Sequence, residues 1–227
     1  LGFKVYPRSA DINFQMAKVF VGLKDQETAT LWASAAANLA PSYIDPVFND
    51  LKLTPENAKS GLTNLAWGLY FARNNERSLA RFDDAAKAGY TDPNAQRGKA
   101  FALFRLGKYK QAIPLLEIAA KLEPKKLRPI DEIVPIPGTN KSWTIRYSAA
   151  STLGWAHYRS GHMKKAERQF KAILKVTPFW VDALTGYGYA LLQKKDNKGA
   201  KEAFVKALNI SPYYPDANQG LKLAEGS

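Results

Sequence analysis

The stretch "LGWAHYRSGHMKKAERQFKAILKVTP", from Leu153 to Pro178, is followed by a second stretch with the same pattern, "YGYALLQKKDNKGAKEAFVKALNISP", from Tyr187 to Pro212. The two stretches carry identical residues at an offset of 34 positions: Gly154 and Gly188, Ala166 and Ala200, Phe170 and Phe204, Pro178 and Pro212. Repetition at a fixed period of this length is typical of proteins that stack similar structural units side by side.

The same period divides most of the chain, which we expect to form one solenoid over residues 1–227. An upstream unit is in phase through Gly107, Ala112 and Pro124, whereas Tyr90 stands where the closing proline of the unit before it should be. The expected repeats are 10–43, 59–92, 93–126, 147–180 and 181–214. Residues 44–58 and 127–146 are inserts between repeats, and residues 215–227 begin a partial C-terminal helix.

Each unit has the pattern of two helices joined by a polar turn. In the last unit, residues 182–193 have apolar side chains at helical spacing, and residues 198–208 form an amphipathic stretch that ends near Pro212. The turn often contains Gly, as in "RLGKY" and "RSGHM". The sequence therefore predicts an all-α fold, an α-solenoid of about five helix pairs.

The repeat resembles the tetratricopeptide repeat (TPR) family. The family's small residue in the first helix, Gly in the turn, Ala and then an aromatic in the second helix, and closing Pro occur in the stretch from Leu153 to Pro178. A similar order occurs in "AFALFRLGKYKQAIPLLEIAAKLEP", residues 100–124. The resemblance implies a right-handed superhelix, whose first helices line a concave groove where partners bind.

The sequence offers little that would support catalysis. It has no Cys, only two His, and no glycine-rich phosphate loop or metalloprotease motif. His157 stands where the family usually has an interior Tyr, so we expect a satisfied interior histidine, and we expect His162 to be solvated. We therefore predict a protein that is not an enzyme, with no catalytic residue, no metal site and no cofactor.

Aromatic residues recur at one place in the repeat. The ninth residue of four successive repeats is Trp67, Phe101, Trp155 or Tyr189, and the twelfth place holds Tyr70, Phe104 and Tyr158. Arg105 and Arg159 follow at the edge of this stripe. Residues three apart share a helix face, so we expect a ligand-binding stripe along the groove, with at least Trp67 and Trp155 partly exposed. The alternative is tighter packing between repeats.

Arg97 is a further candidate for ligand binding. Family members that hold the C-terminal carboxylate of chaperones use Lys and Asn on their first helices. At the corresponding places this chain has Thr63 and Trp67, Arg97 and Phe101, or Ser151 and Trp155, and of these only Arg97 has a suitable charge. That peptide clamp is therefore not expected here in its usual form.

The insert 127–146, "LRPIDEIVPIPGTNKSWTIR", differs from the rest of the chain. Two β-prone runs, 132–136 and 142–146, flank the turn signal "PGTNK", which favours a short β-hairpin or an irregular loop. Its apolar residues predict packing on a repeat, on the groove or on a partner. The other insert, 44–58, contains "TPEN", which predicts a helix start with Thr54 as N-cap and Pro55 in the first position.

The chain carries a formal net charge of +13, with −1 in residues 1–58 and +14 in residues 59–227. The Lys residues are spread over helical stretches, which favours a solvated outer face over a nucleic-acid site. The longest apolar run, 31–40, is about half of the ~20 residues that a membrane-spanning helix needs. The first residue is Leu1, so we expect a processed or excised chain.

Three functions are compatible with these features. The first is a scaffold that binds a protein or peptide segment in the aromatic groove. The second is binding of a polysaccharide chain through aromatic faces, as in bacterial TPR proteins of exopolysaccharide export, which would place the protein in a periplasm or cell envelope. The third is binding of nucleic acid, which ranks lower because the basic residues are not concentrated beside the stripe.

Overall fold

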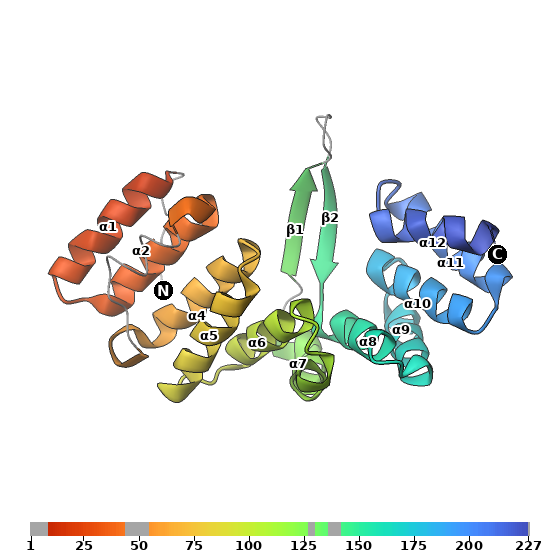
Figure 1. The fold of residues 1–227 in the computed structure, drawn as a ribbon, viewed down its shortest axis with the longest axis horizontal. Coiled ribbons are helices and arrows are strands. Elements are labelled where there is room, and N and C mark those ends of the chain that lie inside the picture. Colours follow the sequence, from red (N-terminus) through yellow and green to blue (C-terminus); the bar gives the residue numbers. More distant parts are fainter. Residues whose placement is uncertain (1–8, 44–54, 127–129, 136–141, 227) are drawn as a thin grey trace. The chain divides into compact units, whose positions relative to one another are not determined.

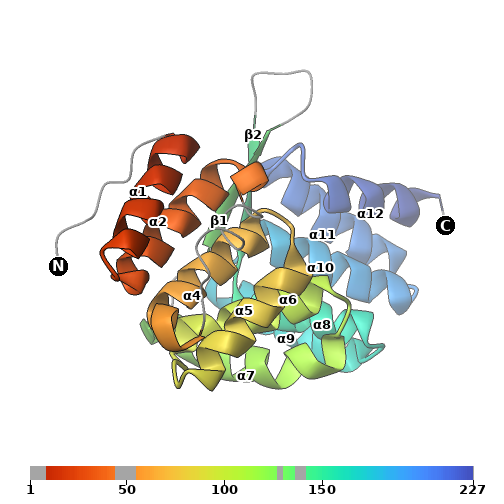
Figure 2. The same ribbon diagram turned by 60° about the vertical axis from the view of Figure 1, so that its left-hand side comes forward.

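The computed structural model describes residues 9–43, 55–126, 130–135 and 142–226 (Figures 1 and 2). These residues belong to two compact units, Leu1–Lys108 and Tyr109–Ser227. Each unit is built from helices that pack against the next helix in the chain. The helical fold predicted from the repeat is confirmed in the described part of the chain, with the insert as the one two-stranded exception.

The first unit contains two helical hairpins and one further helix. Their described elements are α1 (Ala10–Gly22), α2 (Gln26–Leu39), the short 3-10 helix η1 (Pro41–Tyr43), α4 (Pro55–Phe71), α5 (Asn75–Lys87) and α6 (Pro93–Arg105). Several begin at a side-chain cap, such as Asp92, whose carboxylate accepts from the backbone N–H groups of Asn94 and Ala95 at the start of α6. Pro55 is the first residue of α4, as predicted, whereas the proposed N-cap Thr54 lies outside the described residues.

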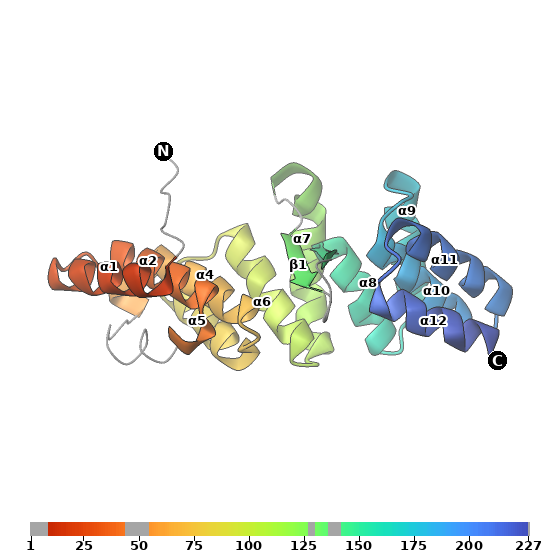
Figure 3. The same cartoon turned by 90° about the horizontal axis from the view of Figure 1, so that it is seen from above.

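The second unit holds the clearest repeats and the insert. Its elements are α7 (Tyr109–Lys126), β1 (Ile130–Pro135), β2 (Ser142–Tyr147), α8 (Ala149–Arg159), α9 (Met163–Val176), α10 (Val181–Gln193), α11 (Asn197–Ile210) and α12 (Pro215–Glu225). Figure 3 shows α10, α11 and α12 side by side at the C-terminal end of this unit.

The insert forms a β-hairpin, one of the two alternatives expected from its sequence. Strands β1 and β2 pair antiparallel, with Val134 opposite Trp143, and β2 extends one residue past the expected end of the insert, to Tyr147 (Figure 1). The turn "PGTNK" and the insert's side chains lie outside the described residues, so a role of 127–146 in recognition stays a prediction. The limits of the five repeats and their assembly into one solenoid also stay predictions.

The turn inside each helical hairpin uses the same strained backbone position. The second residue after helices α1, α4, α6, α8 and α10 has a positive φ: Lys24, Arg73, Gly107, Gly161 and Lys195. Only Gly adopts this conformation without steric cost, so the three long side chains sit there against their intrinsic preference. The Gly expected in the turn is therefore a favourable choice at this position but not a required one.

Replacing Lys195 by Gly should raise the free energy of unfolding by about 0.5–1 kcal/mol, because it relieves the left-handed strain. Replacing Gly161 by Ala should lower it by about 1 kcal/mol for the same reason. Chemical denaturation of both variants provides the measurement. A Lys195→Gly variant less stable than the wild type would contradict the argument.

Phenylalanines of the second helices fill the space that glycines leave open on the first helices. An ideal Cβ built on Gly154 of α8 would lie 2.6 Å from the ring of Phe170, and one built on Gly186 of α10 would lie 2.2 Å from the same ring. Phe204 is held in the same way by Gly188 and Gly220. The small residues in the repeat therefore allow one ring to contact its own hairpin and the next one.

Candidate functional site

Three aromatic side chains of the second unit form a contiguous cluster on neighbouring helices. Trp155 and Tyr158 lie three residues apart on α8, and their ring centroids are 5.7 Å apart. Tyr189 of α10 contacts both, with centroid distances of 5.8 Å to Trp155 and 6.0 Å to Tyr158. All three side chains are half-buried. We call these three residues the aromatic surface.

Asp182, at the start of α10, fixes the indole of this surface. Its Oδ1 accepts hydrogen bonds from Trp155 Nε1 and from the hydroxyl of Tyr214, both at 2.9 Å. Its Oδ2 accepts from the hydroxyl of Ser151. Burial raises the pKa of this carboxyl, while the three hydrogen bonds act in the opposite direction. One carboxyl thus ties together α8, α10 and the residue that precedes α12.

Tyr189 and Arg159 complete the edge of the surface. The Tyr189 hydroxyl donates to the backbone carbonyl of Asp216 at 3.0 Å, which fixes the ring, and burial raises the pKa of this phenol. Arg159 ends α8 and is exposed, close enough to Tyr189 to oppose that rise. The second unit therefore brings together four of the residues selected from the sequence: Trp155, Tyr158, Arg159 and Tyr189.

The corresponding residues of the first unit are buried. Trp67 is 8% exposed and Phe101 is 1% exposed, so the expectation that Trp67 would be partly exposed is wrong. The Trp67 ring packs against those of Phe82 and Phe101, at 5.6 and 6.2 Å, and the guanidinium of Arg97 lies 5.8 Å from its centroid. At the place of Arg97 the later repeat has Thr185, which is too short to cover Trp155.

The hydrogen bonds of the two indole nitrogens also differ, again because the following repeat carries different residues at equivalent places. Asn94 occupies the repeat place of Asp182, but its Oδ1 accepts from Arg97 at 2.7 Å rather than from the indole. Trp67 Nε1 is buried and has no hydrogen-bond partner among the described residues. Arg97 itself is 5% exposed and belongs to the packing of α6.

Tyr70, a twelfth-place residue of the first unit, also packs rather than projects. Tyr70 is 2% exposed, and the guanidinium of Arg105 lies 3.5 Å from its ring centroid while donating to the Tyr70 carbonyl at 2.7 Å. Phe104 is half-buried. Packing, the alternative considered for this stripe, thus accounts for Trp67, Tyr70, Arg97, Phe101 and Arg105, and a role of these residues in ligand binding stays a prediction.

Asp182 was not singled out by the sequence, because one Asp in the first turn of a helix is common and carries no motif.

His157 is buried, as expected, but its Nδ1 has no hydrogen-bond partner in the described part of the chain, so it is not the satisfied histidine predicted. No group of three or more potential metal ligands occurs within the described ranges. None of the helices described is long and apolar enough to cross a membrane.

Comparisons with known proteins match this architecture. The family model of the tetratricopeptide repeat matches residues 63–126 and 151–215, more than half of the chain. YrrB, described as a TPR protein with an unusual peptide-binding site, superposes with a TM-score of 0.57 at 19% identity, covering 95% of this chain and 93% of YrrB. Residues 41 to the end of MamA from Desulfovibrio magneticus RS-1 give a TM-score of 0.56 at 18% identity, covering 91% of this chain and 97% of that fragment.

These likenesses show the fold, and the family match adds the repeat itself. The matched ranges include the turns at Gly107 and Gly161 and the contacts of Phe170 with Gly154 and Gly186. The chain belongs to the tetratricopeptide repeat family.

Proposed function

We propose that this protein is a non-enzymatic scaffold that binds a segment of a partner protein at the aromatic surface. The observation that carries the proposal is the state of Trp155: it is half-buried, contacts Tyr158 and Tyr189, and is held by a hydrogen bond to Asp182. A ring that is fixed but still accessible can bury further apolar area on a partner.

The physical chemistry of these residues suits protein recognition. Tyr and Trp bring large contact areas for little loss of side-chain entropy, and they dominate the energetics of protein interfaces. The hydrogen bonds of Trp155 and Tyr189 fix both rings before a partner arrives, which reduces the entropy lost on binding. The peptide-binding site described for YrrB supports a peptide ligand for a repeat array of this kind.

The test begins with peptides selected from a random phage-displayed library on the intact protein and then synthesised with a fluorescent label. Replacing Trp155 by Ala should weaken their binding by about 2 kcal/mol or more, roughly 30-fold in the dissociation constant. Phe179, which is 76% exposed and lies outside the aromatic surface, provides the matched control, and Phe179→Ala should bind normally.

Thermal unfolding of the same variants separates recognition from packing, because Trp155 also contacts Phe170 at 5.5 Å. Weaker binding measured well below the unfolding midpoint of Trp155→Ala supports the proposal. A variant that unfolds earlier but binds the selected peptides as the wild type does would contradict it. Neutral oligosaccharides tested in parallel provide the alternative: binding of these, together with failure of every peptide, would favour a polysaccharide ligand.

A further inference from the structure

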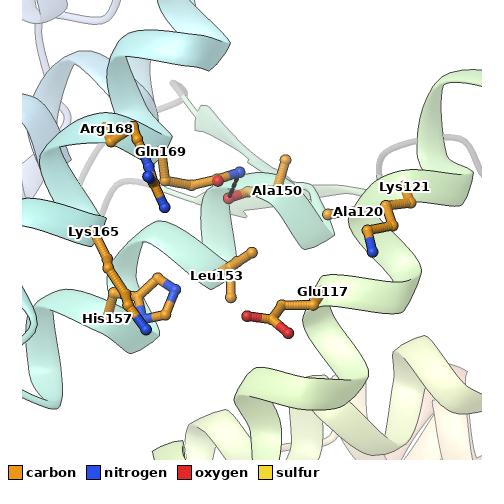
Figure 4. A pocket seen from close by; sticks show the side chains of 9 residues that line it. All are labelled: Glu117, Ala120, Lys121, Ala150, Leu153, His157, Lys165, Arg168 and Gln169. Carbon is orange, nitrogen blue, oxygen red and sulfur yellow. Dashed lines mark hydrogen bonds between the residues drawn. The ribbon is translucent and has the colours of Figure 1, made fainter.

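Helix α8 has a second face that the aromatic surface does not use. Leu153 and His157, four residues apart, lie on the side of the helix opposite to Trp155. With residues of α7 and α9 they line a pocket of about 490 Å³, which Figure 4 shows from close by. This volume is within the range of about 300–1,000 Å³ that is usual for ligand sites.

The pocket carries an excess of positive charge. Lys121 comes from α7, and Lys165 and Arg168 come from α9; all three are exposed, and none has an ion-pair partner among the described residues. Glu117 of α7 is the one acidic residue of the lining, and Figure 4 shows it across the pocket from His157 and Lys165. The lining therefore has three cationic side chains against one carboxylate.

His157 adds an uncharged polar group to one wall. It is 6% exposed, its Nδ1 has no hydrogen-bond partner within the described ranges, and burial together with the charge of Lys165 lowers its pKa. The imidazole is therefore neutral at pH 7. Between the two charged rims lie the buried Leu153 and the half-buried Ala120 and Ala150 (Figure 4).

The next repeat shows that this charge is not a property of the fold. An equivalent pocket between α9, α10 and α11 has a volume of about 330 Å³. There Leu191 takes the place of His157, and Glu202 takes the place of Arg168. The smaller pocket has Asp196 and Glu202 against Lys206, so the two pockets differ in the sign of their net charge, which points to a ligand specific to the first.

We propose that the pocket between α7, α8 and α9 binds an acidic segment of a protein, a second docking site on the opposite side of α8 from the aromatic surface. One or more carboxylates of this segment lie between Lys121 on one wall and Lys165 and Arg168 on the other. An aliphatic side chain of the same segment packs on Leu153. Complementary charge sets the specificity of such a site and makes binding sensitive to salt.

The probe for this site is a fluorescein-labelled peptide of alternating Glu and Leu. A labelled peptide of alternating Lys and Leu is the control of opposite charge. By fluorescence anisotropy, Arg168→Glu should weaken binding of the Glu peptide about tenfold or more, because it replaces one of the three cationic side chains of the lining by a second carboxylate. Glu117→Gln should strengthen binding about two- to fivefold, because it removes the repelling carboxylate. The Lys peptide should not bind the wild type.

Lys198, an exposed residue in the first turn of α11 that lines neither pocket, provides the control for net charge. Lys198→Glu makes the same change in charge as Arg168→Glu and should leave binding within about twofold of the wild type. Circular dichroism of each variant checks that it is folded. Trp155→Ala should also keep the Glu peptide bound, which separates this site from the aromatic surface.

Three outcomes would overturn the proposal. Equal losses in Arg168→Glu and Lys198→Glu would mean attraction to the net charge of +13 rather than to the pocket. Loss of Glu-peptide binding in Trp155→Ala, with normal binding in Arg168→Glu, would show that the acidic segment binds at the aromatic surface instead. A single-stranded DNA oligonucleotide that competes more strongly than the Glu peptide, and depends on Arg168, would assign the pocket to nucleic acid.

Discussion

Replacing Phe170 by Ala should lower the free energy of unfolding by about 3–5 kcal/mol, the usual cost of removing a fully buried aromatic ring. Phe170 has no exposed surface, and its ring is enclosed by Gly154 on α8 and Gly186 on α10. The substitution would leave a cavity against two helices at once. Denaturant-induced unfolding followed by circular dichroism measures the change.

A double-mutant cycle makes this prediction sharper. Gly154→Leu alone should cost about 1–3 kcal/mol, because its Cβ would lie 2.6 Å from the Phe170 ring. In the Phe170→Ala background the same Leu enters the vacated space and removes a helical Gly, so its cost should disappear or change sign. Gly22→Leu provides the control, because a Cβ added at Gly22 would meet no atom within 4 Å. Additive costs at Gly154 and Phe170 would show that the two residues do not share this space.

The fold could be predicted because the repeat encodes it locally. A small residue packs opposite an aromatic one in several repeats, as at Gly188 and Phe204, and these residue types recur at a fixed spacing that a sequence displays directly. The hairpin at 130–147 was predictable only as one of two alternatives, since its β-prone runs are short and no repeat specifies their pairing.

The site was less predictable, because equal places in a repeat do not have equal surroundings. Trp67 and Trp155 share the ninth place, yet Arg97 covers the first, whereas Thr185 leaves the second accessible. Exposure thus depends on the volume of a side chain in the following repeat, which the repeat place of the tryptophan itself does not reveal.

Asp182 shows the same limit for polar contacts. Its three donors are 27 to 32 residues away along the chain, so only the stacking of α8, α10 and α12 reveals that they converge on one carboxyl. In the first unit Asn94 occupies the same repeat place and has a different donor. A network of this kind is specific to one junction between repeats and leaves no periodic trace in the sequence.

Replacing Asp182 by Ala should therefore lower the free energy of unfolding by about 2–4 kcal/mol, because Trp155 Nε1 and the hydroxyls of Ser151 and Tyr214 would all lose their acceptor. Affinity for a partner at the aromatic surface should fall as well, since the Trp155 ring would no longer be fixed. Asp196→Ala, which removes the exposed N-cap of α11, is the comparison and should cost only about 1 kcal/mol.

Asp182→Asn should cost less than about 1 kcal/mol, because an amide can keep all three contacts. Its oxygen can accept from Trp155 and Tyr214, and its NH₂ can donate to the Ser151 hydroxyl, which accepts as readily as it donates. Burial raises the folded-state pKa of Asp182 above the ordinary 3.8, so the part of the stability that comes from protonation of this carboxyl is complete below pH 3.8 and is lost as the pH rises through the folded-state pKa. The Asn variant should therefore gain stability relative to the wild type as the pH rises from 3.8 toward neutrality, as measured by unfolding at several pH values. An Asn variant as unstable as the Ala variant at neutral pH would show instead that the network requires the negative charge itself.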